Sequence, residues 1–192
     1  QGLTMTALFV PPSVLAAGMP GVGAALAERL RHLPQLGIFG CMVHDDDGGR
    51  VRRGLGREPL ITYRLSPRNK ASLLAGMRTL VDIYLAAGAR EVYAPMFGLP
   101  ALRSSADARR LLHDGVPARR MECVTFHPLG TCRIGRDASE GVVDSYGRAF
   151  ELEGLVVADG SVFPTSIGVN SQLPIMAMAT RIAWRLRDEL RG

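Results

Sequence analysis

Three short blocks in the last third of the chain place side chains that can do chemistry beside turn-forming residues. The block 126–135 contains His127 next to a proline, and the block 156–164 contains Asp159 directly before a glycine. The block 168–174 contains Asn170 after a glycine and a valine. Because so many turn residues in an ordered sequence are typical of functional loops, we expect a site in this region.

Each block suits a different task. A neutral imidazole such as that of His127, with an ordinary pKa near ~6.5, can accept or orient a proton near neutral pH. The amide of Asn170 cannot take a proton, but it can hydrogen-bond an oxygen and fix its direction. Gly160 has no Cβ, so the backbone after Asp159 can approach a ligand closely. Asn170 also precedes a helix start, where free N–H groups and the positive dipole end lie.

Simpler interpretations stay open for the same residues. His127 could only satisfy a turn, Asn170 could only cap the last helix, and Asp159 is favoured at a strand-to-turn junction for local hydrogen bonds. A metal site built on His127 with Cys123 and Cys132 is disfavoured, because structural zinc needs four ligands and no fourth is evident.

The elements that must position these blocks are short strands and helices. Helical spacing and end signals predict helices over 22–32, 66–88 and 173–190, with Ser66 as N-cap. Apolar runs predict strands over 5–10, 36–43, 60–65, 91–94 and 155–158, with a proline- and glycine-rich loop over 11–23. The turn-rich residues 45–49 predict a hairpin between 36–43 and 50–53. We therefore expect an α+β fold, a mostly antiparallel sheet with covering helices.

Composition narrows the class of protein. The net charge is +5, yet only Lys70 among the 23 basic residues is a lysine, and the arginines are scattered without interleaved aromatics. This pattern argues against nucleic-acid binding. No apolar run is long enough to span a bilayer, so we expect a soluble protein, cytoplasmic by default. The chain opens with Gln1 in mid-pattern, which predicts upstream sequence.

Taken in order, the three blocks resemble the C-terminal signature of the glucose–methanol–choline (GMC) oxidoreductases, FAD enzymes that oxidise alcohols. The resemblance is sharpest over residues 125–186 and extends loosely back to residue 60. The His-Pro-Leu-Gly and Gly-Val-Asn sequences are most similar to the sterol and long-chain-alcohol oxidase branches. A small-molecule alcohol is the substrate that this resemblance implies.

The resemblance also implies roles for individual residues. His127 would act as the acid–base catalyst, and Asn170 would orient the alcohol hydroxyl above the flavin. Asp159 and Gly160 would contact the ribityl and pyrophosphate region of FAD, largely through backbone groups. The helix start formed by Ser171, Gln172 and Leu173 would face the flavin N1 and C2 carbonyl. This sequence departs from many members at Ser171 and Pro174, where they have proline and threonine.

Domain organisation follows from the same resemblance. Residues 1–124 would form an α+β substrate-binding domain, and residues 125–192 would carry the site and complete an FAD-binding domain. The chain has no phosphate-binding fingerprint, because Gly21–Gly23 is preceded by proline and has Leu26 where the third glycine belongs. We therefore expect a separate N-terminal FAD-binding segment or subunit as partner, and an inactive isolated chain. The alternatives are a non-catalytic remnant that serves as a protein-interaction module, or an unrelated binding module.

Overall fold

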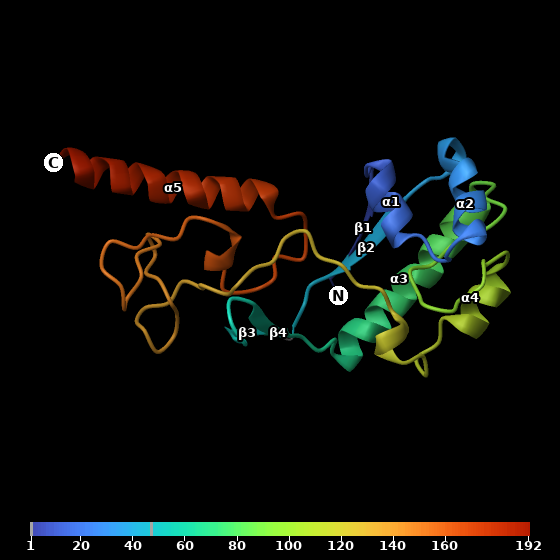
Figure 1. Ribbon diagram of the computed structural model, residues 1–192, viewed down its shortest axis with the longest axis horizontal. Helices are drawn as coiled ribbons and strands as arrows, with labels where there is room; N and C mark the ends of the chain where they lie inside the picture. Colours follow the sequence, from blue (N-terminus) through green and yellow to red (C-terminus); the bar gives the residue numbers. More distant parts are fainter. Residues whose placement is uncertain (1, 47) are drawn as a thin grey trace. The chain divides into compact units, whose positions relative to one another are not determined.

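The computed structural model describes residues 2–46 and 48–192, which divide into two units (Figure 1). The first unit combines the residues up to Val43 with Leu65–Val124, and the second combines His44–Arg64 with Thr125–Gly192. Asp47, part of the predicted turn 45–49, lies outside the described residues. Among the described helices, none has the length and apolar character needed to cross a bilayer.

The first unit is a two-stranded sheet packed against a long helix. Strands β1 (Leu3–Ala7) and β2 (Phe39–Val43) pair antiparallel, and helices α1 (Pro12–Gly18) and α2 (Ala24–Arg31) lie between them in sequence. Helix α3 (Pro67–Ala86) contacts both strands, and α4 (Ser105–Leu111) packs on α3. The buried core is formed by α3 with the segments that follow it, including Leu74, Val81, Met96, Leu102 and Leu112.

The second unit contains the three sequence blocks. Strands β3 (Arg50–Arg53) and β4 (Pro59–Thr62) form an exposed antiparallel hairpin. The long loops after residue 125 lead through a short 3₁₀ turn, η3 (Gly160–Val162), to the C-terminal helix α5 (Gln172–Arg191). Isolated bridges, such as Arg148 with Val156, connect these loops in place of long strands. The site region is therefore loop-built, with α5 as its regular element.

Helix α5 is tied to the preceding loops by an aromatic and ionic cluster. The Tyr146 ring lies under the guanidinium carbons of Arg181 and Arg185, at 4.3 and 5.3 Å from the ring centroid. Glu189, farther along the helix, pairs with Arg148 and with Arg185. Because Tyr146 and Arg148 belong to the loop and the others to α5, this cluster fixes the helix against the loop.

The expected α+β class is confirmed, with small antiparallel sheets and helices. Ser66 caps α3 as predicted, accepting a hydrogen bond from Asn69 N at 3.1 Å, and α5 covers the predicted range 173–190. The predicted hairpin between 36–43 and 50–53 is wrong. β2 pairs with β1, and the basic strand pairs with β4.

Other local expectations also need correction. Residues 91–94 and 155–158 form single bridges rather than strands, and the expected loop 11–23 contains α1. Pro12 at the first position of α1 explains the latter, since its fixed φ suits a helix start and its missing N–H is no loss there. The two units do divide at residue 124, but residues 44–64 belong to the second unit together with residues 125–192. The assignment of functions to the two parts stays a prediction.

We predict that the Tyr146 stack contributes measurably to the stability of the second unit. Replacing Tyr146 by Ala removes two cation–π contacts, each worth about 0.5–1 kcal/mol at an exposed site. Urea denaturation followed by circular dichroism should show a loss of about 1–2 kcal/mol. Tyr146→Phe keeps a ring in place and should retain most of the stability. Equal losses in the two variants would show that the stacking is not the cause.

Candidate functional site

The first two blocks lie side by side, joined by backbone hydrogen bonds. The amide of Cys132 donates to the carbonyl of Ser161 at 3.0 Å, and the amide of Ile134 donates to the carbonyl of Val162 at 2.9 Å. These bonds place the loop after His127 along the turn after Asp159. Residues about 30 apart in sequence are thereby held in register without a regular sheet.

Gly160 is the point where the first two blocks meet helix α5. A Cβ added to this buried residue would lie 3.1 Å from the Leu129 side chain and 3.2 Å from the carbonyl oxygen of Pro128. It would also lie 3.1 Å from the Ile175 side chain on α5. The His127 loop, the Asp159 turn and the first turns of α5 therefore approach one another as closely as they do because residue 160 has no side chain.

Asp159 holds the turn through its carboxylate. Its Oδ1 accepts hydrogen bonds from Ser161 N at 2.8 Å and from Ser161 Oγ at 2.5 Å. These two bonds, the hydroxyl bond first, lower the pKa of the Asp159 carboxyl below its ordinary value. The side chain is thus engaged in shaping the η3 turn, so a ligand contact at this position would use the neighbouring backbone.

Neither of the two predicted catalytic side chains is held by a hydrogen bond from the residues that the structure describes. His127 is half-buried, and its backbone N–H donates to Thr125 Oγ1 at 3.2 Å. Among the residues that the structure describes, no hydrogen bond or ion pair is found at the His127 imidazole or at the exposed Asn170 amide. The two side chains are not hydrogen-bonded to each other. Both polar groups are therefore available to a ligand.

The start of α5 has unsatisfied polar groups. Ser171 occupies the N-cap position, but its side chain does not cap the helix, and its Oγ is buried without a hydrogen-bond partner among the described residues. Leaving a buried hydroxyl unpaired costs about 1–3 kcal/mol. Gln172 and Leu173 in the first turn are exposed. This helix end has N–H groups and a positive dipole end that could stabilise an anionic group.

One contact to this region was not foreseen from the sequence. His44, which follows β2, places its Nε2 2.6 Å from the carbonyl oxygen of Ser166, four residues before Asn170. The two residues are separated by 122 positions in the chain. No local pattern marks His44, because the contact arises only when residues 44–64 join the C-terminal loops.

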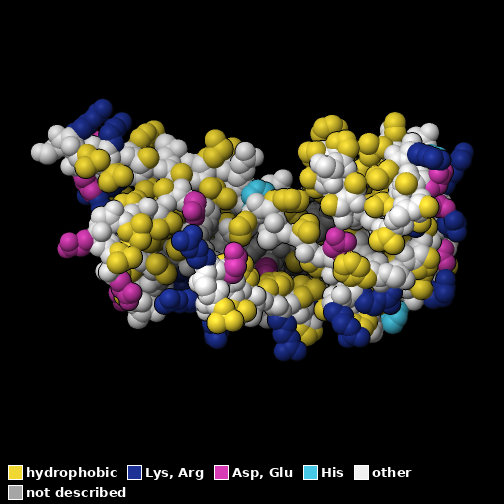
Figure 2. Space-filling view, viewed as in Figure 1, with side chains coloured by type: hydrophobic (Ala, Val, Ile, Leu, Met, Phe, Trp, Pro, Cys, Tyr) yellow, Lys and Arg dark blue, Asp and Glu magenta, His cyan; other side chains and the backbone are white. Residues whose placement is uncertain are grey.

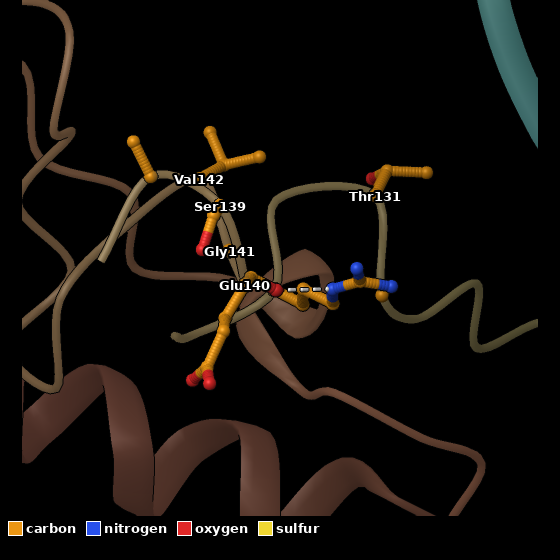
Figure 3. A pocket seen from close by; sticks show the side chains of 8 residues that line it. Thr131, Ser139, Glu140, Gly141 and Val142 are labelled. Carbon is orange, nitrogen blue, oxygen red and sulfur yellow. Dashed lines mark hydrogen bonds between the residues drawn. The ribbon is translucent and has the colours of Figure 1, made fainter. Parts of the chain in front are cut away.

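An open cavity of about 300 Å³ lies beside the loop that follows His127 (Figure 3). In its wall, Arg133 Nε donates to the Glu140 carbonyl at 2.7 Å. The lining consists of Gly130, Thr131, Arg133, Ala138, Ser139, Glu140, Gly141 and Val142, so it includes none of the predicted site residues. Across the described part of the chain, no group of three His, Cys, Asp or Glu side chains could hold a metal ion.

The chain is similar to known flavoenzyme sequences and folds. A family model described as GMC oxidoreductase matches residues 55–179. A GMC-type oxidoreductase from Mycobacterium tuberculosis, itself uncharacterised, is 37% identical over 183 residues, covering 95% of this chain and 29% of the relative. A long-chain-alcohol oxidase from Arabidopsis thaliana is 29% identical, covering 96% of this chain and 26% of the relative. The chain thus spans less than a third of each relative's length.

A solved structure shares the fold. Pyridoxine 4-oxidase from Mesorbium loti aligns with a TM-score of 0.55 and 27% sequence identity, covering 79% of this chain and 29% of that one. This similarity supports the α+β assignment made from the sequence.

We predict that Gly160 tolerates no side chain without loss of stability. The Pro128 carbonyl belongs to the backbone and cannot change rotamer to make room for a methyl group. Gly160→Ala should therefore lower the free energy of unfolding, measured by urea denaturation, by about 1–3 kcal/mol. Gly160→Val should cost more. Gly18→Ala is the matched control, since a Cβ there would meet nothing within 4 Å. If Gly160→Ala were as stable as Gly18→Ala, the His127 loop and α5 would not be packed on Gly160 as described.

We also predict that the Asp159 carboxyl titrates below the ordinary value of ~3.9. Its depressed pKa stabilises the fold at pH values above that ordinary value, and this contribution is lost as the pH falls through the folded-state pKa. Carbon-13 NMR titration of the Asp159 carboxyl measures the shift directly. Ser161→Ala removes the hydroxyl bond and should raise the pKa toward the ordinary value. An unchanged pKa in that variant would refute the assigned cause.

Proposed function

This chain belongs to the GMC oxidoreductase family, and from that premise we propose that it carries the catalytic residues of an FAD-dependent enzyme that oxidises an alcohol. The observation that supports this most strongly is the junction at Gly160. It brings together the His127 loop, the Asp159 turn and the first turn of α5, where the third block of the family signature ends. His127 directly precedes Pro128 in the sequence and Asn170 lies just before α5, and no hydrogen bond or ion pair is found at either side chain among the described residues.

In the proposed reaction, His127 handles the proton of the alcohol hydroxyl. Oxidation removes a hydride from the carbinol carbon and a proton from its oxygen. The imidazole accepts that proton, for which its half-buried and unpaired state leaves a nitrogen available. The Asn170 amide donates to the same oxygen and fixes its direction, so that the C–H bond keeps one orientation. FAD, when bound, supplies the acceptor for the hydride.

The residues at the start of α5 suit an anionic group. The unpaired Ser171 hydroxyl and the helix N-terminus without a side-chain cap are polar groups that a cofactor edge could satisfy. Ser171, Gln172 and Leu173 would face that edge. Since protein atoms surround the Cβ position of Gly160, contact of Asp159 and Gly160 with FAD would involve their peptide groups.

A further segment is needed to complete the site in this proposal. The matched relatives are more than three times as long as the region that this chain covers. Apolar side chains along α5 are exposed, among them Leu173, Met176, Trp184 and Leu190. Apolar side chains are visible over much of the face shown in Figure 2. We propose that an N-terminal FAD-binding segment or subunit covers α5 and holds the nucleotide half of the cofactor.

The proposal is tested by producing the chain together with its FAD-binding segment or subunit. Under anaerobic conditions, addition of a primary alcohol should bleach the flavin absorbance, and oxygen or an artificial acceptor should restore it. A panel from short to long-chain alcohols would define the substrate, for which the Arabidopsis relative favours an apolar chain. The alternative, a protein-interaction module without catalysis, predicts no bleaching with any alcohol.

We predict that His127→Ala and Asn170→Ala affect catalysis and not folding. Loss of a positioned acid–base group costs about 10²–10⁴-fold in rate, and loss of an orienting amide should cost less. Both variants should keep flavin and near-native melting, because no hydrogen bond or ion pair holds either side chain in the described part of the chain.

One outcome would contradict the acid–base role of His127. If His127→Ala released flavin or unfolded the protein while turnover per bound flavin stayed intact, His127 would be a turn residue. The acid–base assignment would then be withdrawn.

A further inference from the structure

The segment that carries Asn170 has no regular structure of its own. Residues 164–170 lie between the η3 turn and α5 and form neither helix nor strand. Asn170 is exposed at the end of this segment. An amide that orients a substrate hydroxyl must hold its direction, since a displacement of about 1 Å can cost 10²-fold in rate. The geometry of Asn170 therefore depends on what fixes residues 164–170.

His44 binds this segment from a distant part of the sequence. Its Nε2 lies 2.6 Å from the Ser166 carbonyl oxygen, which also accepts a hydrogen bond from Thr165 Oγ1 at 2.8 Å. A carbonyl oxygen can only accept, so Nε2 must carry a hydrogen. The Nε2–H neutral tautomer and the protonated ring both meet this requirement. The contact thus does not depend on the charge of His44.

The same histidine packs against Gly168, two residues before Asn170. Gly168 has a φ of +73°, which favours glycine. A Cβ added there would lie 3.1 Å from His44 Cβ and 3.3 Å from His44 Cδ2. His44 therefore contacts the turn at both Ser166 and Gly168, once by a hydrogen bond and once by close packing.

We propose that His44 is a positioning residue that fixes the turn 166–168 and thereby the direction of the Asn170 amide. This inference rests on the proposed function, because it presumes that Asn170 orients the alcohol hydroxyl. His44 acts through the backbone of the turn and is assigned no contact with substrate or cofactor. Its contacts with Ser166 and Gly168 both lie within the second unit.

The hydrogen bond is tested by two substitutions that differ in their ability to donate. In the flavin-loaded protein, His44→Leu should lower kcat about 10–100-fold, in line with a small misplacement of an orienting group, while flavin content stays unchanged. His44→Gln places a donor near the original Nε2 and should recover most of the loss. His32→Leu, at an exposed histidine on the end of α2, is the matched control and should retain wild-type kcat. Equal losses in His44→Leu and His44→Gln would overturn the proposal.

Hydrogen exchange on the chain provides a readout apart from activity. Peptides covering residues 164–170 should exchange faster in His44→Leu than in wild type and His44→Gln, with α5 unchanged. Uniformly faster exchange across the second unit would instead indicate a general loss of folding and overturn the positioning role.

A double-mutant cycle separates this proposal from the proposed function. If His44 acts through Asn170, His44→Leu should have little further effect on kcat in an Asn170→Ala background. Multiplicative losses would show an independent role and overturn the proposal. Normal turnover in both His127→Ala and Asn170→Ala would sink the proposed function itself. A slow His127→Ala and Asn170→Ala beside a wild-type His44→Leu would sink only the positioning role.

Discussion

The close approach of three chain segments at Gly160 is the constraint on which the rest of the site depends. The Pro128 carbonyl and the Leu129 and Ile175 side chains occupy the space where a side chain at residue 160 would lie. Because the His127 loop and α5 both rest on this position, their separation is set by the absence of a Cβ. Two backbone hydrogen bonds, from Cys132 and Ile134, then keep the loop in register with the Asp159 turn.

In this arrangement, the side chains of His127 and Asn170 remain able to bind a ligand. Asp159 uses its carboxylate to hold the η3 turn, whereas no described residue forms a hydrogen bond with the imidazole of His127 or the amide of Asn170. The buried, unpaired hydroxyl of Ser171 adds a cost at the start of α5. Polar groups that lower stability without an internal partner are expected where a ligand binds. Stability is supplied elsewhere, by the Tyr146 cluster on α5 and by the core around α3.

Local signals in the sequence were sufficient for some elements and not for others. Ser66 followed by a proline predicts the start of α3 because a cap acts within one turn, and the apolar stripe of α5 marks that helix for the same local reason. The pairing of β1 with β2 could not be obtained this way, since two helices separate the strands. The nearby turn residues 45–49 favoured the wrong partner. Likewise, His44 and Ser166 are far apart in the sequence and come into contact only in the folded chain. No local sequence pattern therefore predicts this contact. His127, Asp159 and Asn170 are candidate site residues on the sequence alone because turn residues surround them, whereas the packing role of Gly160 is visible only in the structure.

The central claim is that this chain supplies the proton-handling and orienting groups for oxidation of an alcohol carbon. It is tested most directly by the rate of flavin reduction in the complete, flavin-loaded protein, measured anaerobically with a primary alcohol and with the same alcohol deuterated at its carbinol carbon. The account predicts that the alcohol reduces the flavin, that deuteration slows the reduction several-fold, and that His127→Ala slows it with either substrate. A flavin that stays oxidised with every alcohol offered, or that is reduced equally fast in the wild type and in His127→Ala, would contradict it.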